Sequence, residues 1–164
     1  MKKYELTEET KVIGGKTLFR IRALRSFGDI KAGDLGGFIE NERNLSHEGN
    51  AWVSGDARVD GDARVDGDAW VDGDAWVDGN AQVSGDGLIN SNNDYLCEKG
   101  LGSHNRSASF FKCKDGHIHV LCGCFDGNLD EFENKVKEEH GNSKYAKEYL
   151  GFIEVVKTHF EVCQ

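Results

Sequence analysis

Residues 50–85 read NAWVSG-DARVDG-DARVDG-DAWVDG-DAWVDG-NAQVSG, six near-copies of one six-residue unit. A short fixed period of this kind is typical of solenoids, in which each unit packs on its neighbours. Alanine and valine stand two positions apart in every unit, so on an extended strand both point to one face. The glycine beside Asp or Asn supplies a corner with positive φ. The repeat therefore predicts a coil with flat strand sides and glycine corners.

The unit resembles that of the hexapeptide-repeat proteins, as Val59-Asp60-Gly61-Asp62-Ala63-Arg64 illustrates. This resemblance implies a left-handed parallel β-helix with three units in each coil, an exception to the usual right-handed crossover. We expect about three coils over residues 32–93, with Leu35–Ile39 as a degenerate first unit. The predicted fold class is mainly β. It combines this β-helix with a basic N-terminal β cap over residues 1–31 and a small α+β domain, a β-hairpin plus two helices, over residues 94–164.

Charge is unevenly distributed along the chain, whose formal net charge is −9. Residues 1–31 carry eight basic and four acidic side chains, whereas residues 51–93 carry nine Asp against Arg58 and Arg64. Such acidity disfavours direct binding to nucleic acid, which requires cations that neutralise phosphates. No apolar run is long enough for a membrane helix and no signal peptide is visible, so we expect a cytoplasmic protein without membrane contact.

The coil length predicts which outward side chains stack. Residues 18 apart become neighbours, so Trp52 and Trp70 share one side of the coil and Trp76 lies on another. Exposed tryptophans usually mark an interface, and the alternative is that a terminal segment covers them. The regularly spaced carboxylates could imitate a nucleic-acid backbone and occupy a basic groove of another protein. The predicted partner-binding residues are Trp52, Trp70, Trp76, Asp56, Asp60, Asp62, Asp66, Asp68, Asp72, Asp74 and Asp78.

An acyltransferase is an alternative function, since many hexapeptide-repeat proteins transfer acyl groups from coenzyme A with a histidine base. All six histidines lie outside the strict repeats, and His47, at the entrance of the first coil, is the one histidine placed for that role. Coenzyme A also needs cations for its phosphates, of which the repeat has few. We therefore expect no catalytic residue, with His47 as the only candidate, and no cofactor. A self-assembling structural protein is a third alternative.

The C-terminal segment follows an α+β pattern. Asp115-Gly116 predicts a tight turn between strands over residues 107–114 and 117–125, with Lys114 paired to His117. This pairing puts five side chains on one buried face: Phe111, Cys113, Ile118, Val120 and Cys122.

Two helices are predicted after this hairpin. A capping box at Asn128–Glu131 opens a helix that runs to about His140, and Gly141 ends it. The second helix, capped by Asn142 or Ser143, carries an apolar stripe for packing.

Three cysteines and two histidines of the hairpin suggest a zinc hypothesis: Cys113, Cys122, Cys124, His117 and His119. In the predicted register, however, His117 and His119 point away from Cys113 and Cys122, and no paired CxxC motif is present. The spacing of the paired aspartates differs from that of calcium-binding repeats. We therefore expect no metal site, and free thiols at all the cysteines, Cys163 included.

The chain also resembles, over nearly its full length, proteins encoded by phages and prophages. The matching stretches are residues 18–24, 27–37, the repeat, Cys122–Phe125 and Lys144–Tyr149. The resemblance implies no established activity. Together with the acidic coil, it leads us to expect a non-enzymatic inhibitor of a host protein, of the anti-CRISPR kind. The expected partners are that host protein, with a nucleic-acid-binding defence protein as the specific case, and further copies of the chain in a dimer or trimer.

Overall fold

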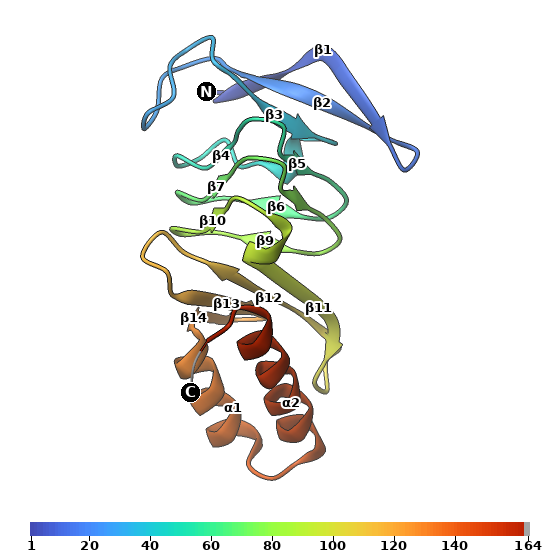
Figure 1. Ribbon diagram of the computed structural model, residues 1–164, viewed down its shortest axis with the longest axis vertical. Coiled ribbons are helices and arrows are strands. Elements are labelled where there is room, and N and C mark those ends of the chain that lie inside the picture. Colours follow the sequence, from blue (N-terminus) through green and yellow to red (C-terminus); the bar gives the residue numbers. More distant parts are fainter. Residues whose placement is uncertain (163–164) are drawn as a thin grey trace. The chain divides into compact units, whose positions relative to one another are not determined.

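The computed structural model describes residues 1–162, and the chain divides into two compact units, residues 1–92 and the residues from Asn93 on. The chain is mainly β, with two helices near its C-terminal end (Figure 1). No helix among the described residues combines the length and the apolar character needed to cross a membrane. The thiol predicted at Cys163 lies outside the described residues.

The repeat forms a stack of two-residue strands in the first unit (Figure 1). The strands are β4 (Trp52–Val53), β5 (Arg58–Val59), β6 (Arg64–Val65), β7 (Trp70–Val71), β8 (Trp76–Val77), β9 (Gln82–Val83) and β10 (Leu88–Ile89). Strands three units apart pair in parallel: β4 with β7, β7 with β10, β5 with β8 and β6 with β9. Each pair joins residues 18 apart, such as Val53 and Val71, which confirms the predicted stacking.

The alanines and valines of the repeat form the inner core of the stack. Each of them is at most 1% exposed, as their shared strand face predicts. The corners between strands are β-turns. In one of them the Ala57 N–H donates to the Ser54 carbonyl oxygen at 3.1 Å, and Gly55 has a φ of 57°. A residue with a Cβ is strained at that φ, which explains why glycine recurs at this position of the unit.

A sheet formed by the N-terminal segment lies at one end of this stack (Figure 1). Strands β1 (Tyr4–Ile13) and β2 (Lys16–Ala23) form an antiparallel hairpin, and β2 pairs with β3 (Leu35–Ile39). Strand β3 pairs in parallel with β5, so the segment predicted as a degenerate unit does enter the stack. Ile39 of β3 pairs with Val59. These two residues are farther apart along the chain than the 18 residues that separate partners in the other strand pairs, because the chain between them includes the short 3-10 helix Glu42–Asn44.

The lysine immediately before β1 is buried. Lys3 has no exposed surface, and its Nζ donates a hydrogen bond to the Ala51 carbonyl oxygen at 2.7 Å. Burial is the main cause that lowers the pKa of Lys3 to about 8, and the positive charge of nearby Arg25 is the second. The folded protein therefore releases this proton near pH 8, whereas the unfolded chain keeps it up to about pH 10.5.

This difference predicts a pH-dependent stability. In that window the unfolded state binds more protons than the folded state, so the contribution of Lys3 to stability rises with pH. The free energy of unfolding of the wild type, minus that of Lys3→Met, is expected to grow by up to about 1 kcal/mol per pH unit. Urea titrations of both proteins across the window measure this difference, and a difference that does not change with pH would contradict the prediction.

The second unit is an antiparallel sheet with two helices packed on one face (Figure 1). Its strands, in pairing order, are β11 (Tyr95–Leu101), β12 (Arg106–Lys112), β13 (Ile118–Cys122) and β14 (Phe125–Asn128). The helices are α1 (Leu129–His140) and α2 (Lys144–His159). Asn128 and Glu131 form the predicted capping box of α1, and the Ser143 side chain caps α2.

The hairpin of β12 and β13 differs by one residue from its predicted register. Phe111 pairs with His119, and Phe110 pairs with Val120. The reason is the turn, which is a three-residue loop and not the predicted two-residue one: the Cys113 N–H donates to the His117 carbonyl oxygen at 3.0 Å. Three-residue loops of this kind end on a glycine with positive φ, here Gly116 at 89°.

A register shift of one residue moves side chains of a strand to the opposite face of the sheet. Phe110, and not the predicted Phe111, therefore packs in the core with the helices, where its ring lies 6.0 Å from that of Phe132. Cys113 moves in the same way. It lies on the face of His117 and His119, so the prediction that the two histidines point away from Cys113 is wrong.

Candidate functional site

The stacked corners of the coil carry the predicted acidic surface. Backbone hydrogen bonds join each corner to the one three units later, such as Asp56 N–H to Gly73 O and Asp68 N–H to Gly85 O. Most of the predicted carboxylates are exposed there, namely Asp56, Asp62, Asp68, Asp74 and Asp78, whereas Asp66 and Asp72 are half-buried. The fold therefore presents negative charge along successive corners of one coil.

Cations outside the repeat neutralise part of this surface. Lys11 Nζ lies 2.8 Å from the Asp56 carboxylate, and Arg43 lies 3.1 Å from that of Asp62. Exposed ion pairs of this kind contribute little to stability, so their main effect is on local charge. The sequence contained no signal for them, because the basic N-terminal segment and the acidic repeat approach each other only in the folded chain.

Trp52 is not a surface residue, contrary to the prediction. Its side chain has no exposed surface, and the rings of Phe27 and Tyr4 meet its indole edge-on at 5.3 and 6.4 Å. The N-terminal segment covers it because β4 lies at the end of its column, where no earlier strand of the column shields the indole. Trp70, the next residue in that column, is half-buried and stays in the candidate surface together with the exposed aspartates.

Asp60 is also buried, at 2% exposed, and cannot contact a partner. Its carboxylate accepts hydrogen bonds from Lys16 Nζ at 2.6 Å and from the indole Nε1 of half-buried Trp76. The bond to Asp60 raises the pKa of Lys16. The guanidinium of Arg58 lies 4.9 Å from the centre of the Trp76 ring. These groups therefore stabilise one side of the coil.

Both ring nitrogens of His47, the candidate base, lie against other groups of the protein. Its Nδ1 accepts the Lys3 backbone N–H at 3.2 Å, and its ring stacks on that of Tyr4 at 4.3 Å. Its Nε2 is buried, has no hydrogen-bond partner among the described residues, and lies 3.8 Å from the Glu42 carboxylate. A general base must reach the proton that it removes, and in this arrangement one nitrogen of His47 is already hydrogen-bonded and the other is buried.

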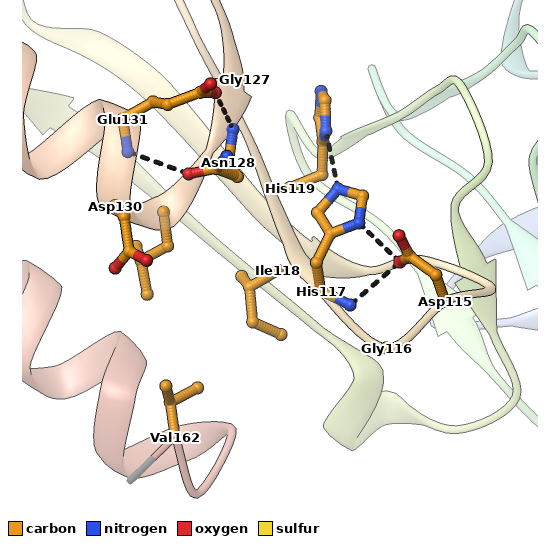
Figure 2. Close-up of a pocket in the computed structure, with 11 residues that line it drawn as sticks. Asp115, Gly116, His117, Ile118, His119, Gly127, Asn128, Asp130, Glu131 and Val162 are labelled. Atoms are coloured by element: carbon orange, nitrogen blue, oxygen red, sulfur yellow. Dashed lines mark hydrogen bonds and ion pairs between the residues drawn. The ribbon is translucent and has the colours of Figure 1, made fainter. Parts of the chain in front are cut away.

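A cleft of about 610 Å³ opens beside the hairpin turn of the second unit (Figure 2). The imidazoles of His117 and His119 lie on one side of it, and Asn128 and Glu131 lie on another. The side chains of Asn128 and Glu131 are held in the cap of α1, where each accepts a backbone N–H at 2.9 Å. The two imidazoles are groups with ligand-binding chemistry in this cleft, and the register shift explains why the sequence did not predict their arrangement with Cys113.

Comparison with known proteins gives a partial similarity. No protein-family model matches the chain. Among curated proteins, it is similar to the "Uncharacterized acetyltransferase YdcK" of Escherichia coli (strain K12), with 39% identity over 61 residues. The match covers 32% of this chain and 19% of that protein, so it spans about a fifth of the relative's length. This partial similarity is consistent with the hexapeptide-repeat acyltransferase family.

Proposed function

We propose that this protein acts by binding, not by catalysis, and that the acidic corners of its coil occupy a basic groove of a partner protein. The coil is, in this proposal, a left-handed parallel β-helix with three units in each coil, as its repeat implies. The partner in this proposal is a nucleic-acid-binding protein of a host cell. The chain inhibits it by occupying its groove, as a phage-encoded inhibitor of the anti-CRISPR kind would. The exposed carboxylates at the stacked corners are the observation that carries the proposal.

The arrangement of these carboxylates supports a cationic partner. Stacked strands are about 4.8 Å apart, so corner residues of successive coils form short rows, such as Asp68 above Asp86. A row of negative charge attracts the Lys and Arg side chains with which a protein groove neutralises phosphates. In this proposal, the carboxylates of the corners take the place of the phosphates that the groove normally binds. The attraction between carboxylates and groove cations weakens as added salt screens it.

A variant that removes one carboxylate from each corner column tests this proposal. Asp62, Asp68 and Asp74 are exposed, so changing them to Asn together should leave the fold intact. The control changes three exposed acids elsewhere, Glu8, Glu98 and Glu138, to Gln, with the same change in net charge.

The measurement is the set of proteins that each tagged variant retains from a bacterial lysate at low and high salt. We expect the wild type and the control to retain a nucleic-acid-binding protein in stoichiometric amount at about 50 mM salt and to lose it by about 200 mM. The corner variant is expected to retain at least tenfold less at low salt. Equal retention by all three proteins would contradict binding through the corners.

Acyl transfer from coenzyme A is the second candidate function, and the similarity to YdcK favours it. The position of His47 argues against acyl transfer, because its Nε2 is buried and the ring would have to leave its stack on Tyr4 to act as a base. Titration with acetyl coenzyme A separates the two candidates. Saturable binding with turnover that His47→Gln abolishes would replace the binding proposal with an enzymatic one.

Self-association remains part of the proposal. Trp70 is half-buried between Trp52 and Leu88 in its column, which leaves apolar surface available for contact with another copy. Light scattering of the purified protein measures whether it forms the expected dimer or trimer.

A further inference from the structure

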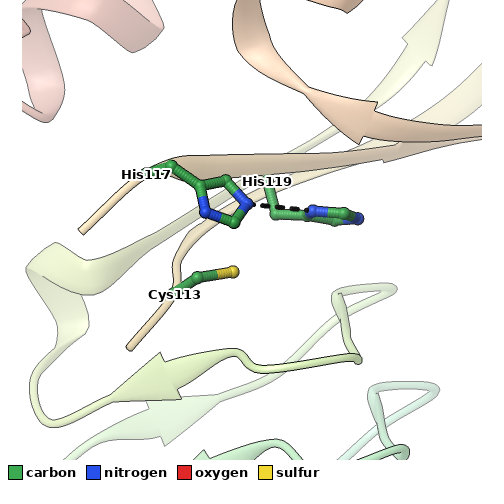
Figure 3. Close-up of side chains that lie close together, drawn as sticks. All are labelled: Cys113, His117 and His119. Atoms are coloured by element: carbon green, nitrogen blue, oxygen red, sulfur yellow. Dashed lines mark hydrogen bonds between the residues drawn. The ribbon is translucent and has the colours of Figure 1, made fainter. Parts of the chain in front are cut away.

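The β12–β13 hairpin brings three metal-ligating side chains together on one face of its sheet (Figure 3). His117 and His119 stand two positions apart on one chain segment and so share a face. Cys113 stands across the turn from His117, in the register described above. The ligand atoms of Cys113, His117 and His119 all lie within 4.8 Å of one another.

The two imidazoles are oriented by carboxylates on their outer sides. Asp115 Oδ1 lies 2.5 Å from His117 Nδ1 (Figure 2), and Asp126 Oδ1 lies 2.6 Å from His119 Nε2. A carboxylate holds a proton on the imidazole nitrogen that faces it, so the outer nitrogens are the donors. Histidine ligands of metal sites have this outer contact with a carboxylate, which fixes the ring and increases its basicity.

When both rings are neutral, the inner nitrogens therefore carry no proton and face each other. His117 Nε2 lies 3.3 Å from His119 Nδ1. Two lone pairs at this distance repel each other unless a cation lies between them. Zn–N bonds of 2.0–2.1 Å in a tetrahedral site place two nitrogens about 3.3 Å apart, which is the separation found here.

We propose that Cys113, His117 and His119 bind a zinc ion. One thiolate and two imidazoles are donors that suit Zn²⁺. Cys113 is buried, and the Phe111 ring lies 5.3 Å from that of His119, so one side of the site is apolar. The histidines also border the open cleft. Three protein ligands leave the fourth position of a tetrahedral ion to water or to a small ligand.

Asp115 and Asp126 are positioning residues in this proposal, since they act on the ion through the imidazoles. The Asp126 side chain is exposed, so Asp126→Asn removes the carboxylate without an effect on packing. Loss of such an outer contact costs about 10- to 100-fold in metal affinity. Asp126→Glu keeps a carboxylate and should retain most of the affinity. The matched control is Asp130→Asn, an exposed aspartate that lines the same cleft.

The experiment titrates the metal-free protein with Zn²⁺ in competition with a chromophoric chelator, and with Co²⁺ as a spectroscopic probe. We expect one equivalent of metal in the wild type and a thiolate-to-cobalt charge-transfer band. Cys113→Ser should abolish the band, and Cys124→Ser, which removes an exposed thiol of the same unit, should keep it. Far-ultraviolet circular dichroism shows whether each variant is folded.

Two outcomes would overturn the proposal. A wild type that binds no Zn²⁺ at neutral pH would mean that a proton, and not a metal, lies between the two imidazoles. Metal binding that persists in Cys113→Ser but disappears in Cys124→Ser would place the ion elsewhere. If Cys113→Ser fails to fold, Asp126→Asn decides, because affinity equal to that of Asp130→Asn would contradict the assignment.

Discussion

Replacing Trp52 by alanine is expected to lower the free energy of unfolding of the first unit by about 3–5 kcal/mol, the range for large buried aromatic side chains. The indole has no exposed surface and contacts the rings of Phe27 and Tyr4. The backbone of β3 also packs against the indole, because a Cβ at Gly36 would lie only 2.7 Å from Trp52 Cζ2. The cavity left by the indole can close only if β3 moves inward, and the pairing of β3 with β2 and β5 opposes that movement, so we expect a cost at the upper end of the range.

Trp70→Ala is the matched control for this prediction. Trp70 occupies the same position one coil later and pairs with Trp52 in the column, but it is only half-buried. We expect it to cost less than half as much, because less apolar area leaves water. Urea unfolding followed by far-ultraviolet circular dichroism measures both, with the transition of each unit fitted separately. Equal losses for the two variants would contradict the covering role of the N-terminal segment.

Asp60→Asn is expected to lower the free energy of unfolding by about 1.5–3 kcal/mol, the range for hydrogen bonds to a charged group. The buried carboxylate accepts from both Lys16 Nζ and Trp76 Nε1. An asparagine can still accept from one of these donors, but its amide nitrogen then faces the other donor and repels it. We expect the loss of structure to begin at the side of the coil that Trp76 and Arg58 share.

The control for this variant lies at the next residue but one. Asp62→Asn changes an exposed carboxylate whose ion pair with Arg43 is itself exposed, so stability should not change measurably. Binding should respond in the opposite way, since Asp62 belongs to the corner surface and Asp60 does not. Denaturant titration gives the stability of each variant, and the lysate retention experiment gives the binding. Similar stability losses in both variants would contradict the structural role of Asp60.

The strict repeat made much of the first unit predictable. One buried alanine and one buried valine in each unit specify which face is inside, and a glycine at each corner specifies where the chain turns. The coil length of three units is what the resemblance to hexapeptide-repeat proteins implies, and the strand pairs have this spacing. The rules for the inner face and the corners are local, and they are repeated often enough that each copy supports the others.

The candidate surface could be predicted only in part. The repeat gives no reason to distinguish Asp60 from Asp62, since both flank one corner glycine. It likewise gives no reason to distinguish Trp52 from Trp70, since both occupy the same position of the unit in one column. The fold distinguishes them, because the N-terminal sheet covers the first coil and brings Lys16 to Asp60. Contacts between residues so far apart in the chain cannot be predicted from a six-residue pattern.

The strands of the coil, its inner face and the acidity of its corners were predictable from the repeat, because these features depend on short-range periodicity, whereas the stacking interval of three units was implied by the resemblance to hexapeptide-repeat proteins. Which tryptophan and which aspartate are covered depends on contacts that form only in the folded chain. The folded chain also sets the hairpin register, which a third loop residue shifts by one position. Because side chains alternate along a strand, that single position moves Cys113 from the face predicted for it to the face of His117 and His119.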